Sequence, residues 1–183
     1  MVYILLGEGF EEVEAVVPLK LLRRVEVDVA TVSLSSDLFV RGGHGLVVMA
    51  DVLLEQVVFG SLDMLVLPGG GAGVVSIGGC PVALELIRRS WGAGKLVAAL
   101  CAAPSLLADL GFLVGKRVVC HPVVFDRVVA AGGVVQPDLA VVRDGNLITG
   151  RAAGSSFVFG LELVAALLGR GVSEDLRRGI FYD

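Results

Sequence analysis

The sequence is poor in cysteine, histidine and basic side chains, and each shortage excludes a class of protein. Its three cysteines, Cys80, Cys101 and Cys120, have no paired spacing, which argues for reduced thiols and against a disulfide framework. The two histidines, His44 and His121, are too few and too scattered to predict a metal centre of the zinc-cluster type. Lys and Arg total 15 against 19 Asp and Glu, a net charge of −4, so we expect no nucleic-acid partner.

The sequence also lacks a long uninterrupted apolar run, although 55% of its residues are hydrophobic and its mean hydropathy is +0.84. A membrane-spanning helix needs about 20 consecutive apolar residues. Residues 96–108 are too few and contain Pro104, and residues 64–84 are interrupted by glycine and proline. No basic segment followed by a cleavage site opens the chain. We therefore expect a cytoplasmic protein without a membrane partner, whose apolar residues fill a large core and part of a subunit interface.

Short apolar runs alternate with helical runs, a pattern typical of an α/β fold with a mostly parallel sheet. Strands are predicted at residues 2–6, 27–33, 63–67, 96–100 and 117–120, with a hairpin over 39–50 and a strand pair at 139–143 and 146–149. Helices are predicted at residues 11–24, 81–91, 104–110 and 155–168, followed by a short terminal helix. Because no repeat or linker interrupts the pattern, we read residues 1–183 as one domain.

Cys101 is the main candidate for chemistry, because it stands where a predicted strand passes into a helix with almost no loop between them. At such a turn, backbone amides and the helix dipole favour negative charge, and therefore the thiolate that acts as the nucleophile. The alternative interpretation is an inert buried thiol, which is the more common state of a lone cysteine.

Three other features follow the carboxyl ends of predicted strands, where sites form in open α/β sheets. These are the acidic start of the first helix with Glu14, the glycine turn with Gly69 and Gly70, and His121. A carboxylate, a histidine and free backbone amides together support thiolate chemistry, and the amides, with that of Ala102, could stabilise an oxyanion. Each feature also has a plain structural interpretation: acids that complement the helix dipole, an ordinary tight turn, and a strand-end residue.

Five motifs in order carry a resemblance to a known family. They are Glu-Glu-Val-Glu-Ala at 11–15, Leu-Pro-Gly-Gly at 67–70, Ala-Ala-Leu-Cys-Ala-Ala-Pro at 98–104, His-Pro at 121–122 and Thr-Gly-Arg-Ala-Ala-Gly-Ser-Ser-Phe at 149–157. This ordered set resembles the ThiJ/PfpI superfamily, in its parkinsonism-associated deglycase branch, over essentially the whole chain. The resemblance implies a flavodoxin-like α/β sandwich with helices on both faces of the sheet and a nucleophile elbow, and a homodimer.

The resemblance also implies roles for individual residues. Cys101 would be the reactive cysteine, Glu14 the acid that hydrogen-bonds it, and His121 a looser partner. Backbone amides around the thiol would come from Gly69, Gly70 and Ala102. Arg151 and Ala153 would border the pocket, although Ala152-Ala153 replaces a glycine-proline pair common in the family. No metal or cofactor is expected. Another departure is Val25-Glu26 at the end of the first helix, where relatives carry a glycine.

The function implied is glutathione-independent conversion of small 2-oxoaldehydes, methylglyoxal to lactate, or a related deglycase activity. The alternative is a redox sensor or chaperone of the oxidative-stress response that uses an oxidisable Cys101. A third possibility is a non-catalytic interaction protein. In the peptidase-like branch of the superfamily a histidine directly follows the nucleophilic cysteine, whereas Ala102 follows Cys101 here, so a peptidase-like role is disfavoured. Glutamine amidotransferases of class I need a late histidine to complete their triad, and no histidine follows His121.

Overall fold

A seven-stranded sheet forms the centre of the computed structural model, which describes residues 1–182. The strand order is β10-β11-β7-β6-β1-β2-β5, and all neighbours are parallel except the β10–β11 pair. The strands are β1 Val2–Leu6, β2 Val29–Ser33, β5 Val52–Leu53, β6 Met64–Leu67, β7 Leu96–Leu100, β10 Val141–Asp144 and β11 Leu147–Gly150. The mostly parallel α/β fold predicted from the sequence is therefore confirmed.

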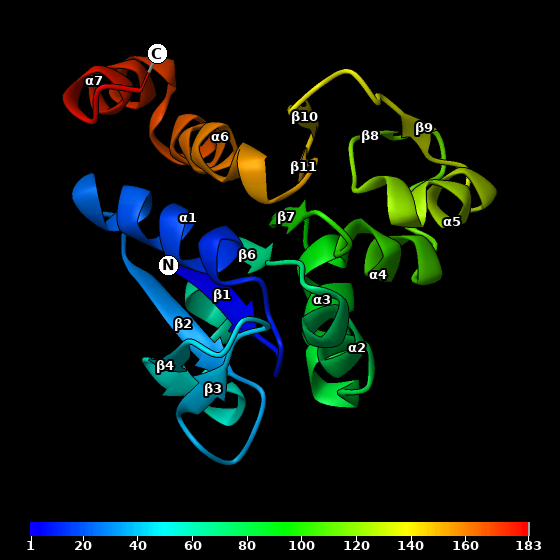
Figure 1. Ribbon diagram of the computed structural model, residues 1–183, viewed down its shortest axis with the longest axis horizontal. Helices are drawn as coiled ribbons and strands as arrows, with labels where there is room; N and C mark the ends of the chain where they lie inside the picture. The colour runs from blue at the N-terminus through cyan, green and yellow to red at the C-terminus, as the bar shows by residue number, and fades with distance from the viewer. Residues whose placement is uncertain (183) are drawn as a thin grey trace.

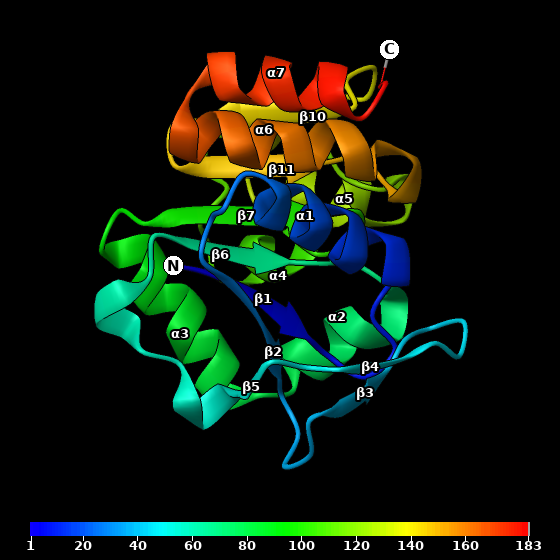
Figure 2. The same cartoon turned by 90° about the vertical axis from the view of Figure 1, so that its left-hand side faces the viewer.

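Helices cover both faces of the sheet (Figures 1 and 2). One face carries α1 Glu12–Arg24, α6 Ser156–Leu168 and α7 Arg170–Gly179, and the other carries α2 Gly71–Gly78, α3 Pro81–Gly92, α4 Pro104–Asp109 and α5 Phe125–Ala130. Alternate residues of β1 point to opposite faces of the sheet and pack against the two helix layers, because side chains alternate along a strand. Tyr3 and Leu5 belong to the core under α3 and α4, and Val2, Ile4 and Leu6 to the core under α1 and α6.

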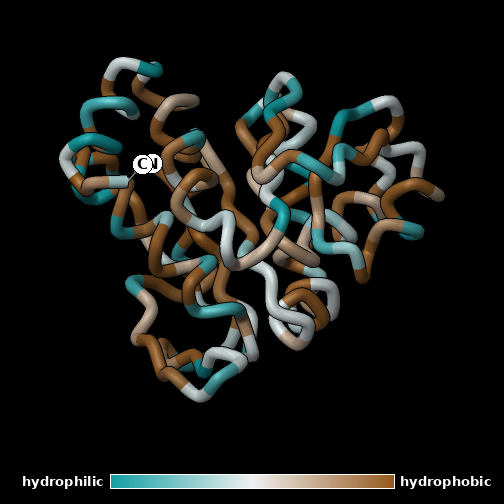
Figure 3. The backbone as a smooth tube through the Cα atoms, turned by 45° about the horizontal axis from the view of Figure 1, so that its top comes forward, coloured by the Kyte–Doolittle hydropathy of each residue, from teal (hydrophilic) through white to brown (hydrophobic). Residues whose placement is uncertain are grey.

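Two small strand pairs lie beside the main sheet. The predicted hairpin is present as β3 Phe39–Arg41 and β4 Val47–Met49, which pair antiparallel. The strand predicted at 117–120 is shorter, β8 Arg117–Val118, and pairs with β9 Val134–Val135 outside the main sheet. Figure 3 shows hydrophobic segments recurring along the whole chain, and the buried ones form two core clusters.

Helix α2 is not among the helices predicted from the sequence, and its segment is rich in glycine. Glycine is a weak helix former, but tertiary packing requires it here. A Cβ on Gly73 would lie 2.7 Å from the Phe10 Cα, so only a glycine lets α2 approach the β1–α1 connection this closely. In the described part of the chain, no single helix is long and apolar enough to span a membrane. Only α2 and α3 taken together would be, and they are bent by 86°.

The end of α1 stores backbone strain at Glu26. This exposed residue has φ +58°, in the left-handed region that a side chain makes unfavourable by about 1 kcal/mol. We expect Glu26→Gly to raise the free energy of unfolding by about 1 kcal/mol in urea denaturation at fixed pH. Glu26→Ala keeps a Cβ and is the control. An equal gain from alanine would contradict the strain explanation.

Candidate active site

The candidate site lies where three adjacent strands of the sheet end. In the order β7-β6-β1, Cys101 directly follows β7, Gly69 and Gly70 follow β6, and the turn after β1 leads into α1 with Glu14. Because parallel strands end at the same edge, residues far apart in sequence meet there. A Cβ built on Gly69 would lie 2.6 Å from both the Cys101 Cβ and the Glu14 Oε2, so the cysteine and the acid flank one glycine.

Cys101 occupies a strained backbone position, as expected of a nucleophile elbow. Its φ is +63°, which is uncommon for any residue other than glycine. Hydrogen bonds on both sides hold it there: its N–H donates to the Gly150 carbonyl at 2.9 Å, and its carbonyl accepts from the His121 N–H at 2.8 Å. Strain of this kind persists only where the surroundings enforce it and is typical of functional sites.

Glu14 is a completely buried acid. Its Oε2 accepts a hydrogen bond from the Gly69 N–H at 2.8 Å. Its Oε1 is also buried and has no hydrogen-bond partner among the described residues. Burial raises the pKa of Glu14 to about 7, although the Gly69 amide acts in the opposite direction. The carboxyl can therefore gain and lose a proton near neutral pH, and Oε1 is the atom free to carry that proton.

The thiol of Cys101 is half-buried beside this acid. Burial raises its pKa to about 12, with a further contribution from the Glu14 carboxylate, while the amides of Ala102 and Gly70 lower it by less. Amides and a helix dipole therefore do not make Cys101 a thiolate on their own. The helix behind it, α4, has only six residues. Once Glu14 is ionised, above about pH 7, the pair holds one proton, which must move from sulfur to Glu14 for the thiolate to form.

One of the predicted oxyanion donors already has an acceptor. Hydrogen bonds from Gly70 and Ala102 favour the ionised sulfur of Cys101. The Gly69 N–H donates to the Glu14 Oε2, so this amide already has an acceptor, and its role at an oxyanion stays a prediction. Gly69 fixes the carboxylate and leaves room beside the thiol.

His121 and Arg151 also make contacts that the sequence did not predict, and the site roles expected of them stay predictions. The His121 ring caps a short 3₁₀ helix, because its Nδ1 accepts from the Val123 N–H at 3.2 Å. The His121 backbone N–H donates to the Cys101 carbonyl at 2.8 Å. Arg151 is exposed and donates to the Pro137 carbonyl at 3.2 Å. Ala153 opens the short 3₁₀ helix before α6 and is half-buried.

Gly150 is a site residue that the sequence analysis missed. Its carbonyl holds the Cys101 N–H, and a Cβ on it would lie 2.0 Å from the Leu100 Cδ1. The available signal was a glycine at the end of a strand, which marks a close backbone approach. A cavity of about 420 Å³ lies elsewhere, between α3 and residues 54–59. The strained thiol and the buried acid, and not cavity size, identify the site.

Gly69→Ala should damage the site directly. The Cβ of the new alanine would lie 2.6 Å from the Cys101 Cβ and from the Glu14 Oε2. The cysteine Cβ is too close to the backbone to move aside. A displacement of about 1 Å can reduce a rate about 100-fold. We therefore expect an alkylation rate of Cys101 at least about tenfold below that of the unmodified protein, measured by mass spectrometry. Gly71→Ala is the matched control, because no atom lies within 4 Å of a Cβ there.

Known proteins of one family are similar to this chain over most of its length. A model of the DJ-1/PfpI family matches residues 1–166. Protein dj-1beta of Drosophila melanogaster is 32% identical over 97% of this chain and 94% of its own, and its crystal structure superposes with a TM-score of 0.94 over 100% of this chain and 97% of that one. A glutathione-independent glyoxalase of Caenorhabditis elegans is 33% identical over 88% of this chain and 85% of its own.

A deglycase of Pyrococcus abyssi is 33% identical over 91% of this chain and 98% of its own. The chain spans only 38% and 42% of two longer relatives, the DJ-1 homologs B and A of Arabidopsis thaliana.

Proposed function

Because the chain belongs to the DJ-1/PfpI family, we propose that it is a cysteine-dependent enzyme that converts reactive 2-oxoaldehydes such as methylglyoxal into 2-hydroxy acids. One observation carries this proposal: a strained Cys101 beside a buried Glu14 whose pKa is about 7 and whose Oε1 has no hydrogen-bond partner among the described residues. The names of two relatives, a glutathione-independent glyoxalase and a deglycase, support it.

In the first step, the sulfur of Cys101 attacks the aldehyde carbon of methylglyoxal while Glu14 accepts the thiol proton. The attack forms a C–S bond and a hemithioacetal oxyanion. The amides of Ala102 and Gly70 donate hydrogen bonds at the sulfur of Cys101, beside the new oxyanion. There they favour the negative charge that develops during the attack. A carboxyl with a pKa near 7 suits this step, because it accepts and returns a proton near neutral pH.

In the second step, a proton moves from the former aldehyde carbon to the neighbouring carbonyl carbon. Glu14 first gives the thiol proton to the hemithioacetal oxyanion, which leaves its carboxylate free to act as a base. The carboxylate then removes the proton from the first carbon and returns it to the second, while the hydroxyl proton passes from the first oxygen to the second, which gives a 2-hydroxy thioester on Cys101. Water then hydrolyses the thioester, releases lactate and restores the thiol. The net reaction is methylglyoxal plus water to lactate, so no oxidant, reductant or cofactor is consumed.

The direct test is to incubate the protein with methylglyoxal without glutathione and to measure lactate together with aldehyde loss. We expect lactate to form in a 1:1 ratio to the methylglyoxal consumed, over many turnovers per chain. Aldehyde loss that stops after one equivalent per chain would show adduct formation without catalysis and would overturn the proposal.

A second candidate function is redox sensing through Cys101. The amides of Gly70 and Ala102, and a protonated Glu14, could donate hydrogen bonds to the oxygens of an oxidised sulfur. Mass spectrometry after mild peroxide treatment distinguishes the two functions. Selective oxidation of Cys101 in a protein that makes no lactate would favour the sensor. Assembly as a homodimer also stays a prediction, to be tested by light scattering.

A further inference from the structure

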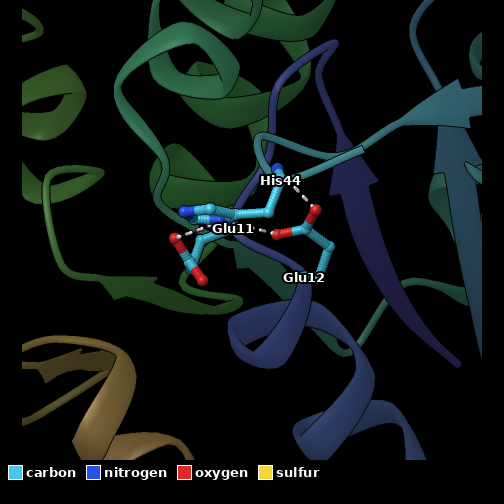
Figure 4. A group of neighbouring side chains, drawn as sticks. All are labelled: Glu11, Glu12 and His44. Carbon is cyan, nitrogen blue, oxygen red and sulfur yellow. Dashed lines mark hydrogen bonds and ion pairs between the residues drawn. The ribbon is translucent and has the colours of Figure 1, made fainter. Parts of the chain in front are cut away.

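Three side chains with metal-binding atoms meet beside, but outside, the Cys101–Glu14 pair. They are Glu11 and Glu12 at the start of α1 and His44 in the turn between β3 and β4 (Figure 4). The His44 Nδ1 lies 3.1 Å from the Glu12 Oε2 and 3.8 Å from the Glu11 Oε2. One ligand atom from each residue lies within 4.8 Å of the other two. The imidazole reaches between the two carboxylates from a different element of the fold.

The backbone holds this arrangement in place. The His44 N–H donates to the Glu12 Oε1 at 2.7 Å, which leaves Oε2 as the oxygen facing the ring. A Cβ on Gly42 would lie 2.4 Å from the same Oε1, so Glu12 can lie against the hairpin only because residue 42 is a glycine. The Gly43 N–H donates to the Phe10 carbonyl at 2.8 Å and anchors the turn to the residue before α1. These contacts hold the Glu12 carboxylate in place beside His44 before any ion binds.

Charge at this cluster favours a cation. Among the ion pairs of residues 1–182, Glu11 and Glu12 contact no lysine or arginine, and His44 is their common partner. Two carboxylates thus face a single imidazole, which leaves net negative charge. The Glu12 and Glu11 side chains are 13% and 25% exposed, whereas His44 is 75% exposed, so an ion and its water ligands can enter from solvent.

We propose that Glu11, Glu12 and His44 bind a zinc ion, with the remaining coordination position open to water. Zinc binds imidazole nitrogen and carboxylate oxygen at about 2.0–2.2 Å in tetrahedral geometry, which places neighbouring ligand atoms about 3.4 Å apart. The two measured separations, 3.1 and 3.8 Å, lie on either side of that value. Magnesium and calcium prefer ligand sets made only of oxygen, so the imidazole favours zinc.

The test uses the full-length protein without a histidine tag, stripped with a chelator and titrated with zinc in a calorimeter. We expect saturable binding of one zinc per chain. His44→Ala and Glu12→Gln should each weaken it by at least about tenfold. His121→Ala removes the only other histidine and is the matched control, expected to bind zinc as the unmodified protein does. Cys101→Ala serves the same purpose for the reactive thiol.

Several outcomes would overturn the proposal. The first is no saturable binding up to about 1 mM zinc. The second is binding that His44→Ala leaves unchanged. The third is binding that Cys101→Ala or His121→Ala abolishes, because zinc would then occupy the site at Cys101. Circular dichroism of each variant separates lost binding from lost folding. The conservative His44→Gln variant repeats the test if alanine disturbs the turn. None of these results depends on whether the protein converts aldehydes.

Discussion

Cys101→Ala is expected to abolish lactate formation from methylglyoxal, with a loss of about three orders of magnitude or more in kcat/KM. The reason is that the C–S bond to the substrate is the first covalent step, and no other described thiol is placed beside Glu14. Cys120 is buried and Cys80 is half-buried beside α3. The measurement is a steady-state assay of lactate with purified protein.

Cys80→Ala is the matched control, because it removes a half-buried thiol that lies in the core under α3, away from the strand ends. It should keep close to full activity. Because Cys101 has φ +63°, Cys101→Gly is a useful second variant. It relieves the backbone strain and should be more stable than Cys101→Ala yet equally inactive. Substantial activity in either Cys101 variant would contradict the covalent mechanism.

Glu14→Gln is expected to lower kcat/KM by about 10²- to 10⁴-fold, the usual contribution of general acid–base catalysis. The unmodified enzyme should also show a characteristic pH profile. Its rate should rise with pH through about 7, because Glu14 must be ionised to accept the thiol proton, and then level off. In Glu14→Gln this inflection should disappear. An inflection that persists unchanged near pH 7 would assign the pH dependence to another group.

The same acid also predicts how stability depends on pH. The folded pKa of Glu14, about 7, lies above its ordinary value of 4.5, so between these values the folded state holds more protons than the unfolded state. Its contribution is fully present below pH 4.5 and is lost as the pH rises through about 7, at a cost of about 3 kcal/mol. Glu14→Gln should therefore gain stability relative to the unmodified protein between pH 5 and pH 8, as measured in urea. If the stability difference between Glu14→Gln and the unmodified protein does not change between pH 5 and pH 8, the raised pKa of a buried Glu14 is contradicted.

Much of the fold could be predicted from the sequence, because the patterns that specify its strands and turns involve residues that are close together in the chain. A continuous apolar run predicted β1 and β7 at the residues where they occur, and the glycines around His44 predicted the β3–β4 turn. The Cys101 turn followed from the short distance between a strand and Pro104. The glycine-rich α2 was missed because the reason for its glycines, close contact with Phe10, lies 63 positions away in the sequence, a separation that no local pattern reveals.

The sequence by itself determined the fold class, the strand ends and the identity of the nucleophile candidate, because periodicity and turn chemistry act over a few residues. Only the tertiary structure decided the electrostatics. Burial and a neighbouring carboxylate outweigh the amides at Cys101, and the Gly69 N–H is committed to Glu14. Folding also brings His44 to Glu11 and Glu12, across more than 30 positions, where the sequence predicted no metal site. Desolvation and distance depend on neighbours in space, and these exist only after the chain has folded.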